Sequence, residues 1–325
     1  MTELPNKEIL FFYESKQNPN GDPGFDNQPR VQPDGTLIVT DVRLKRTIRD
    51  YLRDHKGKTI FVDYNEKGEP QRAKERVIGL LSLKKIDEKT VIKDLIIKTS
   101  DVPLFGALVP IQSDKSAKGG DNASDDKGSS AKFTGPVQFS IGRSVNIVTV
   151  INPQIVGRFV GDKKANVQKQ HSTFGKFYSV EYALIKFTGV VFPKNLGPYF
   201  KDEEVVMKFK EEEAGLADAI WNGTNSLVSR SKYPQRSIFY LEIAYDGTLY
   251  NDLGVLVRES PEAHGSGLKE LPKKVFDFSR LVSSLKVRKP LSVKIRYVRD
   301  ISDEIEQLAA ELARAGIKVD SACTG

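Results

Sequence analysis

The chain has 325 residues, of which 50 are Lys or Arg and 43 are Asp or Glu, so its formal net charge at pH 7 is +7. Hydrophobic residues make up 39% and charged residues 29%, as in a globular protein, and no apolar run approaches the ~20 residues that a membrane span needs. The single cysteine, Cys323, excludes an intrachain disulfide and a cysteine metal site. We expect a cytoplasmic protein without membrane association or a signal peptide, and the excess of positive charge favours a polyanionic partner.

The first predicted elements are a strand and a basic helix. Glu8–Tyr13 reads EILFFY, a buried strand that ends at the turn residues of Asn18–Gly24. Thr40 is a good N-cap for a helix over Asp41–Asp54. The apolar residues of this helix recur at helical spacing and predict one buried face: Leu44, Ile48, Tyr51 and Leu52.

Apolar segments separated by turn residues predict the remaining secondary structure. The helices are expected over Gln71–Leu81, Glu88–Lys98, Glu203–Trp221 and Ser302–Arg314, the last one capped by Ser302. The strands are expected over Thr59–Tyr64, Thr134–Asn146, Ile147–Ile151, Phe177–Val191, Arg236–Tyr245, Leu291–Val298 and Ile317–Val319.

Two strand-and-helix halves separated by long insertions fit an α+β fold with a ferredoxin-like or RRM-like core, which we expect to be a single core over residues 1–325. Gln112–Lys132 contains no large apolar residue and predicts a mobile insertion. Gly157–Lys176 is polar and basic between strand-like segments, which predicts a β-hairpin arm.

The basic helix is the first candidate for nucleic-acid binding. The helix carries five basic residues that predict a positive outer face suited to phosphate groups: Arg43, Lys45, Arg46, Arg49 and Arg53. A solvated helix face explains the same run of charges, so the helix by itself leaves both interpretations open.

Catalytic signals are weak. His55, His171 and His264 have no metal-binding spacing, and Asp22 and Asp26 lie in a turn that its Gly and Pro residues explain. The chain has no P-loop, GxGxxG, GxSxG or RNP1 octamer. We therefore expect no cofactor, no metal and no catalytic residue, and binding through insertions and basic grooves rather than through an aromatic sheet surface.

Four ordered segments resemble a known family. NPNGDPGFDNQPR (Asn18–Arg30) and VTDVRLKRTIRDYL (Val39–Leu52) resemble the N-terminal signature of the CRISPR-associated Cascade backbone subunit, the seventh Cas family, in its type I-B and I-C branches. VPLFGA (Val102–Ala107) and TGPVQFSIGRSVN (Thr134–Asn146) are similar to the next two blocks of that family. The resemblance is looser in the second half, where SRSK (Ser229–Lys232) is the similar segment.

The resemblance implies an RRM-like palm with a finger-type insertion over residues 55–133, a mobile loop at 112–132 and a thumb-like β-hairpin arm at 152–176. It implies RNA contacts from the basic helix, the strand after TGPVQ, the arm and the SRSK segment: Arg43, Lys45, Arg46, Arg49, Arg143, Ser144, Lys163, Lys164, Lys169, Arg230 and Lys232. It further implies that Val160, Val167 or Phe174 of the thumb replaces the stacking of a flipped base.

The resemblance also implies the partners. Such a subunit coats crRNA along its spacer without reading the sequence, beside other Cascade subunits, and leaves recognition of target DNA to base pairing. Copies associate head to tail into a helical filament along the RNA. The subunit is structural rather than enzymatic.

Two other functions stay open on these residues. Backbone subunits of type III complexes cut target RNA with an aspartate of an early loop, and Asp22, Asp26 and Asp41 lie in or beside such a loop. Regularly spaced, metal-dependent cuts in a complementary RNA identify that endoribonuclease. A stand-alone RNA-binding module is the third function, and the four ordered segments argue against it.

Overall fold

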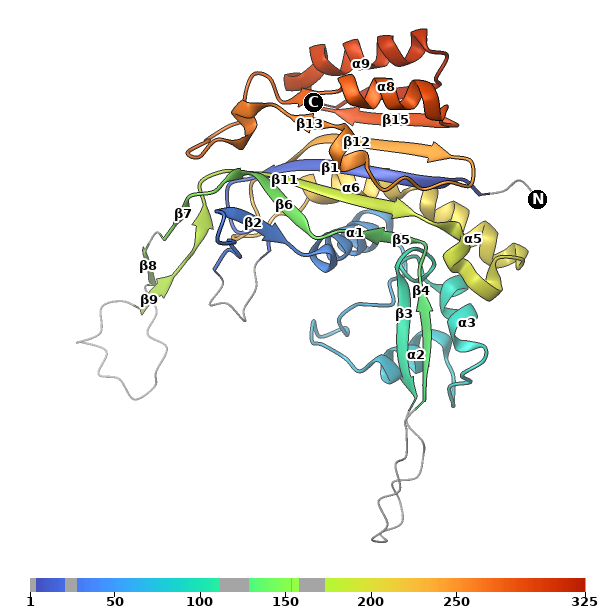
Figure 1. Cartoon of the computed structure of the whole chain (residues 1–325). Helices are drawn as coiled ribbons and strands as arrows, with labels where there is room; N and C mark the ends of the chain where they lie inside the picture. Colours follow the sequence, from blue (N-terminus) through green and yellow to red (C-terminus); the bar gives the residue numbers. More distant parts are fainter. Residues whose placement is uncertain (1–3, 21–27, 112–128, 153, 158–172, 325) are drawn as a thin grey trace, which may run out of the picture.

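A mixed β-sheet forms the centre of the molecule (Figure 1). The computed structural model describes residues 4–20, 28–111, 129–152, 154–157 and 173–324, with the backbone alone at 154–157 and 173–176. Neighbouring strands follow the order β16-β15-β12-β1-β11-β6-β2, with β5 paired to the end of β11. The strands are β1 (Asn6–Ser15), β2 (Thr36–Val39), β5 (Val137–Phe139), β6 (Gly142–Ile147), β11 (Ala183–Val191), β12 (Gln235–Tyr245), β15 (Ser292–Tyr297) and β16 (Val319–Cys323).

The central strand β1 is buried on both faces, which explains its unbroken apolar run. It pairs antiparallel with β11 on one side and with β12 on the other, so that Phe11 lies between Phe187 and Tyr240. The strand predicted at Glu8–Tyr13 is confirmed and is longer at both ends.

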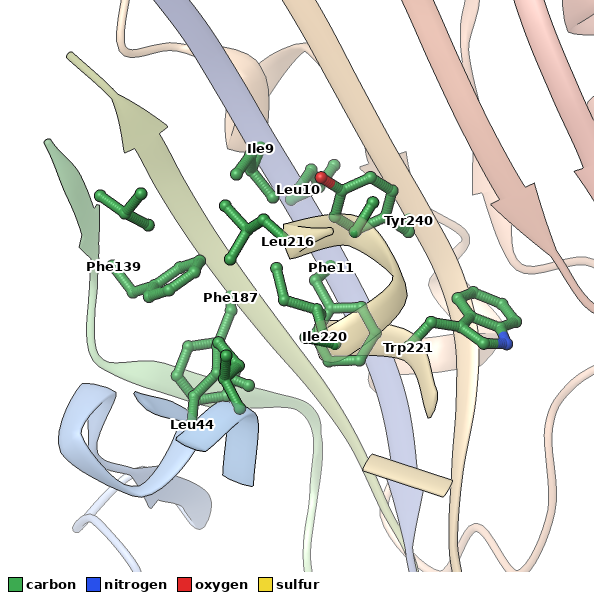
Figure 2. Close-up of a cluster of buried hydrophobic side chains, with 14 of the residues drawn as sticks. Ile9, Leu10, Phe11, Leu44, Phe139, Phe187, Leu216, Ile220, Trp221 and Tyr240 are labelled. Carbon is green, nitrogen blue, oxygen red and sulfur yellow. The ribbon is translucent and has the colours of Figure 1, made fainter. Parts of the chain in front are cut away.

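Helices α1 (Asp41–Lys56), α5 (Glu203–Ala214) and α6 (Leu216–Asn225) lie on one side of the sheet (Figure 1). Figure 2 shows Leu216 and Ile220 of α6 and Leu44 of α1 directed at the aromatic side chains of the sheet. Gly223 allows α6 to approach α1, because an added Cβ would lie 3.1 Å from Cβ of Tyr51. The predicted N-cap is confirmed, since Oγ1 of Thr40 accepts from the N–H of Arg43.

The second face of the sheet is covered by the C-terminal third of the chain. This part contains α7 (Leu253–Leu256), β13 (Arg258–Glu259), η3 (Pro261–His264), β14 (Phe276–Asp277), α8 (Ser279–Arg288), η4 (Arg299–Ile301) and α9 (Ser302–Arg314). The ring of Phe276 lies 4.8 Å from that of Phe12 and 5.0 Å from that of Phe239, measured between centroids, and both sheet residues are fully buried. Nucleic-acid bases therefore cannot stack on these sheet residues without displacing the C-terminal segment.

An insertion between α1 and β5 contains α2 (Ala73–Leu81), α3 (Val91–Lys98), α4 (Val102–Phe105) and the hairpin of β3 (Gly106–Ile111) and β4 (Ser129–Thr134). Helices α2 and α3 confirm the predictions there, with later starts. The strand predicted at Thr59–Tyr64 is wrong. The carboxylate of Asp101 accepts from the N–H groups of Phe61 at 2.7 Å and Val62 at 3.1 Å, so a side chain takes the place of a neighbouring strand.

A second excursion leaves the sheet between β6 and β11. It contains the strand pair β7 (Val150–Ile151) and β10 (Ser179–Val180), and beyond it the antiparallel pair β8 (Gln154–Gly157) and β9 (Thr173–Lys176). The N–H of Val180 donates to the carbonyl of Gln17, which holds the base of this excursion beside the end of β1.

Several predicted boundaries are wrong, each for a local reason. The helix predicted at Glu203–Trp221 is two helices that meet at Gly215. The strand predicted at Thr134–Asn146 is split into β5 and β6, which pair with different stretches of β11. Between them the N–H of Ser140 donates to the carbonyl of Thr188.

The C-terminal end also differs from the prediction. Oγ of Ser302 donates to the carbonyl of Arg299 and does not cap α9. Ile317 lies in the turn that closes α9, since Gly316 has a left-handed backbone conformation and the N–H of Ile317 donates to the carbonyl of Leu312. The last strand is therefore Val319–Cys323. Helix α8, Ser279–Arg288, was not predicted.

Candidate nucleic-acid interface

Three segments of the sequence resemblance meet in space at the end of β1. The N–H of Asn18 donates to the carbonyl of Ser231, and Nζ of Lys232 donates to the carbonyl of Asn18, both at 3.0 Å. Oδ1 of Asn20 accepts from the N–H of Thr40 at 3.1 Å. The early loop thus joins the start of α1 to the SRSK segment, two parts of the chain that are far apart in sequence.

Arg43 and Lys232 are the cations at this junction. Lys232 is 7% exposed, and its Nζ also bonds to Oγ of Ser231 at 3.0 Å. Burial first, and the positive charge of Arg43 second, lower the pKa of Lys232 to about 8. Burial also lowers the pKa of Arg43, whose Nη2 donates to Oγ1 of Thr47. Within the described ranges neither cation forms an ion pair with a carboxylate, so the positive charges of the buried Lys232 and the half-buried Arg43 are not neutralised there.

A cavity of about 410 Å³ opens beside this junction, between α1 and the residues that follow α6. Its lining combines cations, carboxylates and exposed aromatic or apolar groups: Arg43, Arg46, Thr47, Asp50, Tyr51, Arg53, Asp54, His55, Tyr64, Gly223, Ser226, Leu227 and Val228. Tyr64 is 51% exposed and lies 5.2 Å below the guanidinium of Arg46. Such a cavity offers hydrogen-bond donors to phosphates and one open ring face to a base.

The other cations of α1 do not form the free positive face that was expected. Lys45 is buried between Oδ2 of Asp41 at 3.3 Å and Oε1 of Gln138 at 3.0 Å. Arg46 is paired with Asp50 and with Asp63. The prediction of an open basic stripe along α1 is therefore wrong, because Asp41 and Asp50 one turn away on the helix, and Asp63 outside it, pair with these cations.

Arg49 is also held by an internal partner. Its Nε donates to Oδ2 of Asp101 at 2.8 Å, and its guanidinium lies 5.0 Å from the ring centroid of Phe105. This pair attaches the insertion to α1 and neutralises the charge of Arg49 inside the fold.

Arg143 and Ser144 lie on β6 and point to opposite faces. Arg143 is exposed and stands opposite Lys186 of β11. Ser144 is 4% exposed, and its Oγ accepts from the N–H of Leu37 and donates to the carbonyl of Asn146. Ser144 consequently does not face solvent, and the expectation that it faces RNA is wrong.

Arg230 is exposed at the base of the second excursion. Its guanidinium lies 5.3 Å from the ring centroid of Phe177, directly after β9. The aromatic partners Phe177 and Tyr64 were missed in the sequence. A search for single aromatic residues next to polar, basic segments would have found both.

Several predicted residues lie outside the described residues. These are the arm cations and thumb positions Lys163, Lys164, Lys169, Val160 and Val167, the side chain of Phe174, and the early-loop aspartates Asp22 and Asp26. In the part of the chain that is described, no group of three or more His, Cys, Asp or Glu side chains is placed to hold a metal ion. None of the helices there has both the length and the apolar character that a bilayer crossing requires.

The two described histidines, His55 and His264, do not form a common site. His55 stacks on Tyr51 with the ring centroids 5.0 Å apart, and His264 lies 3.9 Å from Glu259 on the opposite face of the sheet. His171 is outside the described residues.

The model of the family described as CRISPR-associated protein Cas7 matches residues 5–274. The chain belongs to the Cas7 family. The family resemblance noted in the sequence is thereby confirmed, and the matched span includes the early loop, α1, both excursions and the SRSK segment of this Cas7 chain.

A curated relative is the CRISPR-associated protein Cas7 of Haloferax volcanii, which is 28% identical over 337 residues, covering 99% of this chain and 86% of the relative. Among solved structures, a chain of a CRISPR RNA-guided surveillance complex is 12% identical with a TM-score of 0.47, covering 90% of this chain and 88% of that one. A chain of the type III-B Cmr-beta complex bound to cognate target RNA has a TM-score of 0.35 at 10% identity, covering 72% and 59% of the two chains.

Proposed function

We propose that this Cas7 chain is the backbone subunit of a type I CRISPR surveillance complex. In this role it binds crRNA along the spacer without reading its sequence and holds the bases for pairing with target DNA. The partners are crRNA, target DNA through the guide, other Cascade subunits and further copies of the chain in a helical filament. Because this role brings the protein together with these partners, we propose that it is cytoplasmic.

The observation that carries the proposal is the pair Arg43 and Lys232. Cations shielded from water are normally neutralised by carboxylates, and the buried Lys232 and the half-buried Arg43 have no ion pair among the described residues. A phosphate diester supplies the missing charge and accepts hydrogen bonds from both side chains. A contact of this kind is independent of base identity, as a subunit that carries many different guides requires.

We divide the predicted RNA-binding cations by their surroundings. Arg43, Lys232, Arg230 and Arg143 have no ion pair among the described residues and are the main phosphate contacts. Arg46 makes a smaller contribution to RNA binding, on the side of the cavity where it lies over Tyr64. Lys45 and Arg49 stabilise the fold through their contacts with Gln138 and Asp101. The arm adds Lys163, Lys164 and Lys169, and its thumb side chains Val160, Val167 or Phe174 fill the gap left by a flipped base.

An RRM-like palm is the core of this proposal. Two features support it. The core elements follow one another along the chain as β1, α1, β6, β11, α5 with α6, and β12, and the four strands lie side by side in the order β12-β1-β11-β6, all antiparallel. We assign residues 55–133 as the finger and residues 152–176 as the thumb, because each leaves the sheet between consecutive core strands and carries its own strand pair.

Guide-length RNAs of unrelated sequence test the proposal. We expect equal affinities for them, a steep loss of affinity with salt, and particles that grow with RNA length. Lys232→Met removes one phosphate contact and lowers the slope of log affinity against log salt by about 1. Lys286→Met, an exposed lysine on α8, is the matched control and leaves the slope unchanged. Sequence-dependent affinity, or a chain that stays monomeric on long RNA, contradicts the proposal.

The complex of the protein with guide RNA also allows a test for catalysis. We propose that the chain does not cut RNA, so a complementary RNA stays intact with Mg²⁺ or Mn²⁺ present. Cuts at regular spacing that disappear in Asp22→Asn or Asp26→Asn would establish the endoribonuclease alternative instead.

A further inference from the structure

A buried carboxylate outside the candidate RNA interface forms no ion pair with any cation in the described part of the chain. Glu8 of β1 is 2% exposed, and its Oε1 accepts from the N–H groups of Tyr250 and Asn251, the latter at 2.7 Å. Two such donors stabilise a carboxylate but do not neutralise its charge. In the described ranges no Lys, Arg or His forms an ion pair with Glu8.

The nearby cations are already used. Lys7 points to the other face of the sheet and pairs with Glu213 at 2.5 Å and Glu242 at 3.0 Å. Arg288 holds Asp252 through two hydrogen bonds at 2.6 and 2.7 Å. Neither of them is free to neutralise the Glu8 carboxylate.

A cavity of about 230 Å³ opens onto Glu8. It lies between the end of β11, β5 and the loop before α7, and its lining includes Ser140, Thr188 and Asn251 together with the apolar side chains of Phe139 and Leu253. Oγ of Ser140 accepts from the N–H of Thr188 at 3.2 Å and from its hydroxyl at 2.9 Å, which leaves Oγ1 of Thr188 as the hydroxyl oxygen with free lone pairs. The volume is several times the ~30 Å³ that one water occupies in the liquid.

We propose that this cavity binds a primary ammonium group on a short alkyl chain, with Glu8 as its counter-ion. An ammonium group has three N–H donors and no acceptor, which suits the Glu8 carboxylate and the hydroxyl oxygen of Thr188. The methylenes lie against Phe139 and Leu253. The ligand is either a small free amine or the lysine side chain of a neighbouring protein chain, since both present the same chemistry.

The direct test is calorimetric titration of the full chain with n-butylammonium chloride, which copies a lysine side chain. We expect saturable one-to-one binding, weakened by about tenfold or more in Glu8→Gln, because a neutral amide keeps both backbone hydrogen bonds and loses the charge. Tetramethylammonium, which has no N–H, does not bind. Glu262→Gln, an exposed site with the same change in charge, binds as the wild type does.

Equal affinity of wild type and Glu8→Gln, or no saturable heat in the wild type, overturns the proposal. If Glu8→Gln fails to fold, Thr188→Val replaces it and weakens binding through the lost hydroxyl. Sedimentation without added amine separates the two sources. If the wild type forms an assembly that dissociates both on addition of n-butylammonium and in the Glu8→Gln variant, the ligand is a lysine of a second copy. If wild type and Glu8→Gln sediment with the same size, the ligand is a free amine. Guide RNA binding by Glu8→Gln stays normal, so failure here leaves the RNA-binding proposal intact.

Discussion

Arg49 of α1 donates to Asp101 of the insertion at 2.8 Å, and the Asp101 side chain is completely shielded from solvent. The same carboxylate accepts from the N–H groups of Phe61 and Val62, so one side chain satisfies three donors from two parts of the chain. The relationship fixes the start of the insertion against the basic helix. It also shows why a basic residue of this helix is committed to the fold.

Asp101→Ala should lower the free energy of unfolding by about 3–5 kcal/mol, because it leaves a buried guanidinium and two backbone N–H groups without a partner. Arg49→Met should cost less, since the carboxylate keeps its two backbone donors. Urea denaturation at pH 7 measures both. Asp320→Ala, on the exposed strand β16, is the control and should change stability little. Equal losses for Asp101→Ala and Asp320→Ala would show that the buried pair has no structural role.

Lys232 should make stability depend on pH. Its pKa is lowered from 10.5 to about 8, so between these values the folded chain has released a proton that the unfolded chain still holds. The free energy of unfolding therefore rises with pH across this window, on the order of 3 kcal/mol in total. Lys232→Met removes this contribution. The measurement is the free energy of unfolding of wild type and of Lys232→Met, each at pH 8 and at pH 10.5. The difference between the two proteins at each pH cancels the titration of the other groups. A constant difference contradicts the prediction.

Two arginines three residues apart on α1 should differ in RNA binding. Arg43→Met should weaken binding of guide-length RNA by about tenfold and reduce the salt slope by about 1, since Arg43 has no ion pair among the described residues. Arg46→Met should have a smaller effect, because Asp50 and Asp63 already neutralise Arg46. Fluorescence anisotropy at several salt concentrations measures both. If Arg46→Met costs more than Arg43→Met, ion pairing does not decide which cations bind RNA.

Phe276 should be a stability residue and not an RNA-binding residue. Its ring lies between Phe12 and Phe239 over the second face of the sheet, so Phe276→Ala should cost about 3–5 kcal/mol through the cavity it leaves. Phe276→Leu fills much of that space and should cost less. RNA affinity of the folded Leu variant should equal that of the wild type. A large loss of RNA affinity with normal stability would mean that this face takes part in binding.

The residues by themselves determined the main elements and the family. The apolar run of β1, the helical spacing and Thr40 cap of α1 and the ordered motifs are local features, and local features are readable from sequence because each depends on neighbouring residues alone. The Cas7 match then agrees with the family inferred from those motifs.

Only the tertiary structure decided which cations are available. Lys45, Arg46, Arg49, Arg43 and Lys232 are all basic in sequence, but the first three meet partners that lie on other segments, whereas the last two come together with no ion pair among the described residues. The same holds for Ser144, whose hydroxyl is used inside the sheet. Charge is a property of a residue, and a pair one helical turn apart, such as Arg46 with Asp50, can be read from sequence. Pairs such as Arg46 with Asp63 and Arg49 with Asp101 join residues distant in sequence, and those contacts exist only in the folded chain.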